Sequence, residues 1–244
     1  MSSQGFLLPG DNVSPHWLPI PTNPSVSLKL GPGLRHIPPD TITPVVAGEV
    51  CVDAKRNAIW MEHNGGRYVP AVGDTVLAVI HHSSTDFYHC MITPHAPFAM
   101  LPQLSFPSAT KKTRPMLGSG SLVYARVSLA NKHMDPELEC VHPSTGKADG
   151  LGELKGGMLF DISLGMARRL MMPQPARQGG IIVLQELAET VPFEMAVGRN
   201  GRVWIEAGNV RATVAVGRAL IDVDQHQMGV DEQKKLAVKL RKAL

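Results

Sequence analysis

The hydrophobic pattern between residues 67 and 142 is that of short strands joined by turns. Runs rich in Val, Ile, Tyr and Phe are separated there by Gly, Pro, Ser and Asn, as in half-buried strands and their connections. We expect strands at 74–81, 85–92, 98–101, 121–130 and 137–142. Five strands within about 75 residues fit a small OB-type barrel. The connection 102–120 is then a long loop, and loops of that length in compact domains are often functional.

Beyond residue 157 the pattern changes to one that mixes helices with strands. We expect a strand at 158–163, helices at 164–172 and 181–189, strands at 192–197 and 202–206, and a helix at 209–222. This β-α-α-β-β-α order is that of a KH module. A last helix, 231–244, carries Leu236, Leu240 and Leu244 along one side. We expect it to dock on the KH-like body through that side and to leave its basic side in solvent.

The beginning of the chain is rich in proline, with nine of the 20 prolines in the first 45 residues. Proline fixes the backbone and removes a hydrogen-bond donor, which disfavours long helices and central strands. We therefore expect an extended arm and turns, followed by strands at 45–52 and 58–62. The expected packing residues of the arm are Leu7, Leu8, Val13, Trp17 and Leu28.

The predicted fold class is a multidomain chain that combines β and α+β domains. The boundaries are 1–66 for an N-terminal, proline-rich β domain, 67–147 for the OB-type barrel, and 148–244 for the KH-like domain with its C-terminal helix. The composition agrees with packed cores, since 43% of the 244 residues are hydrophobic and 18% are charged. Wholesale disorder is excluded.

The sequence also indicates a soluble intracellular protein. Its apolar runs fall short of the roughly 18 residues that a membrane span needs, and its start lacks the features of a signal peptide. Cys51, Cys90 and Cys140 are widely spaced and odd in number, which favours a reducing compartment. We expect no contact with a membrane.

Charge is unevenly distributed along the chain, although the net charge is only +3. Residues 230–244 carry five basic and two acidic side chains, which accounts for the whole excess. Residues 87–134 contain neither Asp nor Glu. A local positive field therefore survives in that window.

The long loop of this acid-free window is the best candidate for contact with RNA. OB barrels bind single strands through basic grooves and loops that follow the phosphates. The candidate RNA-binding residues are Lys111, Lys112 and Arg114 in the loop and Lys132 at a strand end, with Phe106 as a possible stacking partner for a base. The alternative is an ordinary solvated surface loop.

Motifs for catalysis are not evident, and we predict a protein that is not an enzyme. His81, His82, His89 and His95 lie near Cys90, but their spacing matches no zinc-ligand pattern. On the expected strand, His81 and His82 point to opposite faces. A nucleophile elbow of the form Gly-x-Ser-x-Gly and a motif of paired carboxylates are both missing. We expect no catalytic residues, no metal and no cofactor.

The segment Gly198-Arg199-Asn200-Gly201 formally satisfies the Gly-x-x-Gly pattern by which KH domains clamp a nucleic-acid backbone. That function needs the glycines between the first two helices, where this chain instead has residues 173–180. Here the motif falls between two expected strands, so a tight hairpin is favoured. We therefore assign a structural role to Gly198, Asn200 and Gly201, and place Trp204 in the core rather than on a base-stacking surface.

Several segments in order resemble one family. Residues 8–13 (Leu-Pro-Gly-Asp-Asn-Val), 31–35 (Gly-Pro-Gly-Leu-Arg) and 67–74 (Arg-Tyr-Val-Pro-Ala-Val-Gly-Asp) resemble the signatures of RNA exosome cap subunits. Residues 104–106, 109–115 and 130–132 resemble the ribosomal RNA-processing protein 40 branch, as does the Gly-x-Asn-Gly segment with its following Arg-Val-Trp. The resemblance covers nearly the whole chain. One departure is the stretch 88–96, which carries His89, Cys90 and His95 where the family has more Val and Gly.

The resemblance implies an N-terminal β domain, an S1-type OB barrel and a KH domain in a non-catalytic subunit. Such proteins sit with two other cap subunits on a six-membered ring of RNase PH-like subunits, in a hetero-oligomer that feeds RNA to a 3′-to-5′ exoribonuclease for RNA processing and decay. Lys111, Lys112 and Arg114 would then face the path of single-stranded RNA. Residence in the nucleus, the nucleolus and the cytoplasm is implied in the same way.

Two other interpretations belong to different classes of protein. A free-standing OB/KH factor would bind single-stranded RNA by itself, as a monomer with a working phosphate clamp. A hydrolase that uses the His/Cys cluster would contain bound metal. The displaced Gly-x-x-Gly and the near-zero charge outside the last helix count against the first, and the ligand spacing counts against the second.

Overall fold

A computed structural model of the chain describes residues 2–13, 18, 27–54, 57–63, 66–172 and 181–242. It contains two compact units, residues 1–65 and 66–244. Trp17, the segment 173–180 between the two expected helices, and Leu244 lie outside the described residues. Each unit is described by itself.

The first unit is a four-stranded sheet of order β1-β5-β6-β2 with a separate hairpin of β3 and β4. Its strands are β1 (Ser2–Leu7), β2 (Lys29–Leu30), β3 (Leu34–Ile37), β4 (Thr41–Pro44), β5 (Gly48–Asp53) and β6 (Ala58–Glu62). The expectation of an arm is wrong for β1, which pairs antiparallel with β5. Proline is absent from the chain before Pro9, so this segment keeps the donors that a ladder needs. The core of the unit contains Leu7, Val13, Ile42, Val50, Val52, Ile59 and Met61.

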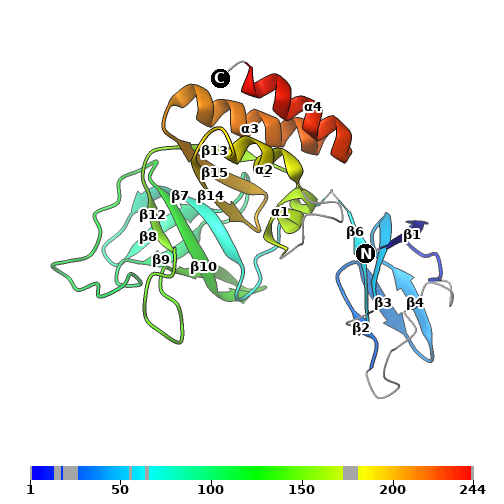
Figure 1. The fold of residues 1–244 in the computed structure, drawn as a ribbon. Coiled ribbons are helices and arrows are strands. Elements are labelled where there is room, and N and C mark those ends of the chain that lie inside the picture. The colour runs from blue at the N-terminus through cyan, green and yellow to red at the C-terminus, as the bar shows by residue number, and fades with distance from the viewer. Residues whose placement is uncertain are drawn as a thin grey trace. The chain divides into compact units, whose positions relative to one another are not determined.

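The second unit begins with the predicted five-stranded barrel (Figure 1). Its strands are β7 (Thr75–Ser83), β8 (Phe87–Met91), β9 (Ala99–Pro102), β10 (Leu122–Asn131) and β11 (Met134–Glu139). The barrel closes because β11 pairs with both β9 and β10. A strand that was not expected, β12 (Gly152–Leu154), adds to β10. Apolar side chains that alternate along the strands fill the interior, among them Val76, Ala78, Ile80, Cys90, Leu101, Val123, Ala125, Val127 and Leu138.

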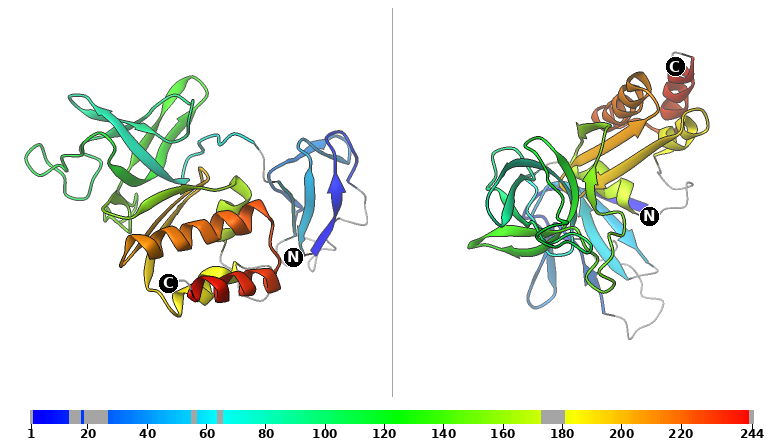
Figure 2. Two further views of the ribbon diagram at one scale, coloured as in Figure 1. Left: turned by 90° about the horizontal axis from the view of Figure 1, so that it is seen from above. Right: turned by 90° about the vertical axis from the view of Figure 1, so that its left-hand side faces the viewer.

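The KH part follows in the predicted order. Its elements are β13 (Met158–Asp161), α1 (Leu164–Met171), α2 (Ile182–Ala188), β14 (Phe193–Gly198), β15 (Arg202–Ala207) and α3 (Val210–Gln225). The strands form an antiparallel sheet of order β13-β15-β14. Ser163 and Asn209 cap α1 and α3 by accepting backbone N–H bonds in the first turn. Figure 2 shows α3 lying along this sheet.

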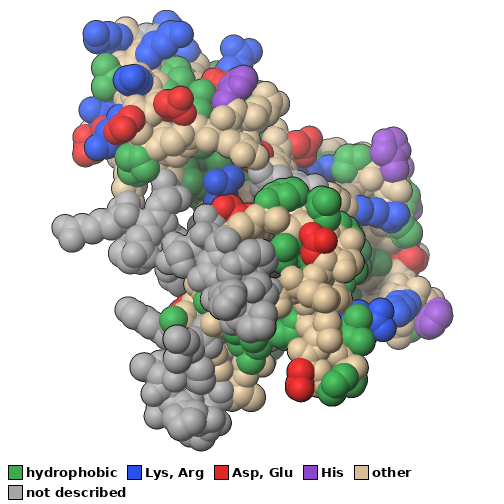
Figure 3. All heavy atoms as spheres, turned by 90° about the vertical axis from the view of Figure 1, so that its right-hand side faces the viewer, with side chains coloured by type: hydrophobic (Ala, Val, Ile, Leu, Met, Phe, Trp, Pro, Cys, Tyr) green, Lys and Arg blue, Asp and Glu red, His purple; other side chains and the backbone are tan. Residues whose placement is uncertain are grey.

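The last helix, α4 (Val230–Arg241), docks on the KH core as expected. Ala237 is fully buried, and Leu236 and Leu240 pack against the same core. Gln233 caps α2, because its Oε1 accepts from the backbone N–H of residues 182 (2.9 Å) and 183 (3.3 Å). Lys and Arg side chains gather over this end of the molecule in Figure 3. Of the described helices, none is long and apolar enough to cross a membrane.

Candidate nucleic-acid interface

The Gly198–Gly201 segment forms the turn between β14 and β15 and faces the barrel. Gly201 has a φ of +74°, which an L side chain rarely adopts. A Cβ at Gly198 would lie 2.2 Å from Oδ1 of Asn200 and 2.7 Å from the backbone nitrogen of Leu77. Both glycines are therefore required by the turn and by the close approach of the two domains.

Asn200 is the residue that joins the KH sheet to the barrel. Its side-chain amide donates to the carbonyls of Leu77 (2.8 Å) and Ile92 (2.7 Å), and its Oδ1 accepts from the N–H of Leu77 (3.2 Å). Asn200 is only 5% exposed. Because Leu77 offers both its N–H and its C=O to one carboxamide, Asn200 acts like a residue of a neighbouring strand. The carboxamide thus occupies a position in the ladder beside β7.

Arg199 in this turn and Arg202, the first residue of β15, also contact the barrel. The backbone N–H of Arg199 donates to the carbonyl of Thr75 (2.8 Å), and its Nε lies 3.7 Å from Oδ1 of Asp74. Arg202 is 4% exposed, donates to the carbonyl of Met91 (3.2 Å) and pairs with Asp161 (3.3 Å). The turn therefore binds protein rather than presenting open N–H groups to a phosphate.

Trp204 and Arg126 also form hydrogen bonds within the protein. Trp204 is 4% exposed, and its indole N–H donates to the carbonyl of Gly156 (3.0 Å). Arg126 donates to Glu139 across the β10–β11 pair (2.9 Å from Nε). Neither side chain presents a free face to a base or a phosphate.

The long connection between β9 and β10 is anchored at both ends and exposed between them (Figure 1). At its start, Phe106 is buried in the barrel core, so the expectation that this ring could stack on a base is wrong. At its end, Leu117 enters the same core, and Tyr88 donates to the carbonyl of Pro115 (2.5 Å). Thr110 and Thr113 hold the tip through mutual hydrogen bonds of 2.8 to 3.2 Å. The Phe106 ring points inward because this loop and the barrel share one hydrophobic core.

The three predicted cations of this loop differ in their exposure and in their hydrogen-bond partners. Lys111 and Lys112 are exposed at the tip. Arg114 is half-buried, and its guanidinium donates to Oε1 of Gln103 and to the carbonyl of Thr85 (3.4 Å). Gln103, at 3% exposure, was not singled out from the sequence. Arg114 thus fastens the loop to the β7–β8 turn, and Lys111 and Lys112 are left for a ligand.

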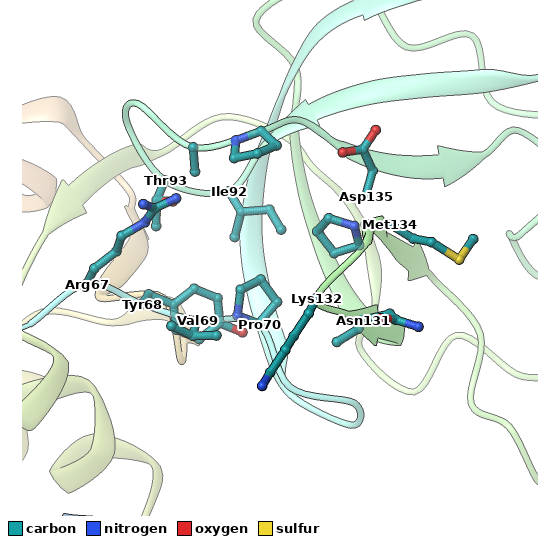
Figure 4. Close-up of a pocket in the computed structure, with 14 residues that line it drawn as sticks. Arg67, Tyr68, Val69, Pro70, Ile92, Thr93, Asn131, Lys132, Met134 and Asp135 are labelled. Carbon is teal, nitrogen blue, oxygen red and sulfur yellow. The ribbon is translucent and has the colours of Figure 1, made fainter. Parts of the chain in front are cut away.

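Lys132 lies away from these lysines, at the other end of β10. The strand runs ten residues from Leu122 to Asn131, which is roughly 30 Å at about 3.3 Å per residue. Lys132 lines a pocket of about 290 Å³ together with Arg67, Tyr68, Pro70 and residues of the β8–β9 connection. Figure 4 shows the Arg67 and Asp135 side chains on opposite sides of this pocket. The four predicted RNA-binding residues therefore do not form one patch; their contact with RNA remains a prediction.

His81 and His82 lie on the same face of the barrel, which corrects the expectation that they point to opposite faces. The β7–β8 register shifts between Ile80 and His82, which marks a bulge. A bulge places two residues opposite one and breaks the alternation of a strand. The rings of His82 and His89 stack with their centroids 4.1 Å apart.

The surroundings of the three cysteines do not activate their thiols as nucleophiles. Burial raises the pKa of Cys90 to about 12, and burial raises the pKa of Cys140 as well. Burial, followed by the charges of Glu62 and Glu49, raises the pKa of Cys51 to about 11. All three thiols are protonated at neutral pH and are weak nucleophiles. The described part of the chain also contains no group of three or more His, Cys, Asp or Glu that could hold a metal ion.

Comparisons with known proteins agree with this architecture domain by domain. Family models match residues 28–67 (Exosome complex exonuclease Rrp40 N-terminal domain), 68–152 (Exosome complex component RRP40, S1 domain) and 157–211 (KH domain). Among curated proteins, Exosome complex component rrp40 of Schizosaccharomyces pombe is 40% identical over 222 residues, which is 89% of this chain and 88% of that protein. The chain belongs to the RRP40 family of exosome complex components.

Other relatives support the same family. Exosome complex component RRP40 of Saccharomyces cerevisiae is 34% identical over 90% of this chain and 89% of its own length. The human protein of that name is 33% identical over 74% of this chain and 62% of its own length. A crystal structure assigned to an exosome complex RNA-binding protein has the same fold, with a TM-score of 0.56 at 22% identity over 72% of this chain and 97% of that chain. In this RRP40-family chain the Gly-x-Asn-Gly segment is the joint between the S1 barrel and the KH sheet.

Proposed function

We propose that this chain is a non-catalytic, RNA-binding cap subunit of the exosome, which guides single-stranded RNA toward a 3′-to-5′ exoribonuclease. Membership in the RRP40 family supports its place in that complex. The observation that carries the RNA contact is the contrast between two basic segments. Arg202, which follows the Gly198–Gly201 turn, is buried and donates to the barrel, and Arg199 in the turn lies beside Asp74 of the barrel. Lys111 and Lys112, in contrast, are exposed on an anchored loop.

The exposed lysines supply modest, salt-dependent attraction to phosphates. Each phosphate contact to single-stranded RNA contributes a slope of about −0.7 in a plot of log affinity against log salt concentration. Two lysines cannot hold RNA tightly alone. In an assembly, several such loops would act on one strand at high effective concentration. We therefore place the affinity in the complex rather than in the isolated chain.

The proposed partners are the RNase PH-like ring subunits, the other cap subunits and single-stranded RNA. The N-terminal unit would serve mainly as a docking surface for these proteins. The proposed sites of action are the nucleus, the nucleolus and the cytoplasm. A pull-down of the tagged chain from its own cell extract, followed by mass spectrometry, tests the partners. Recovery of ring and cap proteins in near-equal amounts supports the proposal, and recovery of the chain alone or with RNA only contradicts it.

The RNA contact is tested by charge reversal in the reconstituted complex. Lys111→Glu/Lys112→Glu should weaken binding of a single-stranded oligonucleotide. The matched control is Lys234→Glu/Lys235→Glu, which reverses an adjacent, exposed lysine pair on α4. The control should change affinity much less. Equal effects of the two pairs would show that only net charge matters, and this would refute a role for the loop.

A free-standing RNA-binding factor predicts a different result. Such a factor would bind the oligonucleotide as tightly in isolation as in the complex at matched salt. We expect the isolated chain to bind far more weakly than the complex, because it lacks the other loops. The isolated chain should also leave a 3′-labelled RNA intact, as expected of a non-catalytic subunit.

A further inference from the structure

Four aromatic rings form a continuous cluster on the outer surface of the S1 barrel. The rings of His82 and His89 are stacked, with centroids 4.1 Å apart and planes inclined by 11°. His81 meets His82 edge-on at 5.4 Å and lies 4.7 Å from the ring of Phe98. Phe98 also lies edge-on to His82 at 5.9 Å. We call these four residues the ring cluster.

The ring cluster is built by the bulge in β7. In a regular strand His82 would follow Val76, Ala78 and Ile80 into the barrel interior. The bulge instead turns His82 outward beside His81, and His89 of the paired strand stacks on His82. His81 and His82 are exposed, and His89 and Phe98 are half-buried. Ring surface is therefore open to solvent without being part of the core.

The ring cluster lies beside the basic loop. The hydroxyl of Ser119, near the end of that loop, donates to the carbonyl of His81 (2.8 Å). Arg114 contacts the carbonyl of Thr85 in the turn that connects β7 to β8 (3.4 Å). Residues 87–134, which supply β8, β9, the loop and β10, contain neither Asp nor Glu. Open rings and exposed cations thus share one region, in which Asp86 of the β7–β8 turn is an acidic neighbour.

This combination fits single-stranded RNA better than a protein partner. Sites for single strands combine aromatic rings, on which bases stack, with cations that follow the backbone. The ring nitrogens of histidine also offer hydrogen bonds to base edges. The buried core of a protein interface is typically apolar, whereas three of the four side chains here are imidazoles.

We propose that the ring cluster of His81, His82, His89 and Phe98 is a stacking site for bases of single-stranded RNA, and that Lys111 and Lys112 hold the phosphates of the same strand. The inference rests on the proposed function, since it places the bases of the RNA that the loop attracts. It assigns contact with the bases to the β7–β8 surface of the barrel.

The test uses the reconstituted complex, an oligouridylate and an oligomer of the same length and charge that lacks bases. His82→Ala/His89→Ala should weaken binding of the oligouridylate roughly 5- to 150-fold, the range of stacking on one base. Binding of the abasic oligomer should not change. His82→Phe/His89→Phe keeps the ring surface, and it should restore affinity for the oligouridylate to within about threefold of the parent.

The controls separate this inference from the proposed function. Lys111→Ala/Lys112→Ala should weaken both oligomers and reduce the salt slope by about 1.4, whereas the histidine variants should leave the slope unchanged near pH 8. Cross-linking of 4-thiouridine RNA, read by mass spectrometry, should label residues of the ring cluster. If the parent complex binds neither oligomer, the proposed function fails.

Three results would overturn the stacking site itself while RNA binding stands. The first is equal binding of the oligouridylate by the parent and the alanine variant. The second is equal loss on the abasic oligomer. The third is loss of co-purifying exosome subunits from the alanine variant without loss of RNA binding, which would make the ring cluster a protein interface.

Discussion

Replacement of Asn200 by alanine should weaken the joint between the S1 barrel and the KH sheet. The substitution removes three hydrogen bonds, two to Leu77 and one to Ile92. Each bond contributes about 0.5–1.5 kcal/mol net, and buried groups that lose their partner cost about 1–3 kcal/mol. At about 1 kcal/mol for each bond, we expect Asn200→Ala to lower the free energy of unfolding by about 3 kcal/mol. For a unit of this size the midpoint of thermal unfolding should fall by roughly 6–12 °C.

The assay is urea and thermal unfolding of the full chain, with hydrogen exchange of the Leu77 amide as a local readout. That amide donates to Asn200, so its exchange should accelerate. Asn131→Ala is the control, because Asn131 is exposed and accepts one bond from His133 (3.1 Å). We expect the control to change stability by less than about 0.5 kcal/mol.

Asn200→Asp should destabilise the protein more than Asn200→Ala at neutral pH. The new carboxylate would keep the acceptor oxygen. It would also face the carbonyls of Leu77 and Ile92, which in the parent accept hydrogen bonds from the Asn200 amide. Burial and these carbonyls would raise the pKa of the introduced group above its unfolded value near 3.9. Its penalty is therefore largest above the folded pKa and is relieved as the pH falls. A loss below about 0.5 kcal/mol for Asn200→Ala, or an aspartate that is tolerated like alanine, would refute the reasoning.

Three further predictions concern other parts of the second unit. Gly198→Ala should cost about 2 kcal/mol in urea unfolding, because its Cβ would meet Oδ1 of Asn200 at 2.2 Å. Partial desolvation by its neighbours, and then the charges of His89 and His81, lower the pKa of His82 from its usual value. NMR titration should show this low pKa, His89→Ala should raise it, and stability should decline as the pH falls below about 6.5 because the unfolded chain takes up the proton first. Cys90, whose pKa burial raises to about 12, should resist iodoacetamide at pH 8 in the folded chain and react in urea.

Local features of the fold could be predicted from the sequence because they depend on nearby residues. The turn at residues 83–86 gives the β7–β8 hairpin, in which the N–H of Ser84 donates to the carbonyl of Phe87 (2.8 Å). Asn200-Gly201 likewise lies in the turn between β14 and β15. The change from strand to helix periodicity places the KH elements in their order. These signals are local, since turn chemistry and periodicity act within a few residues.

Features that depend on distant partners could not be predicted in this way. The pairing of β1 with β5 joins segments more than 40 residues apart, and β12 reaches back to β10. Periodicity indicates which side of a strand is buried but not which strand lies next to it. The bulge at His81 and the partners of Arg114 could not be predicted for the same reason, because both depend on neighbouring segments of the fold.

The hydrogen bonds of Asn200 depend on the path of the barrel backbone and not on the identity of the barrel side chains. All three of its bonds end on main-chain atoms, as do those that Arg202 makes to Met91 and the Arg199 N–H makes to Thr75. Substitutions of the barrel side chains at these positions should leave the joint intact, whereas a substitution of Asn200 should weaken it. A chimera that carries a barrel from a distant relative should therefore still bind this turn. A KH domain without asparagine at residue 200 should bind even its own barrel more weakly.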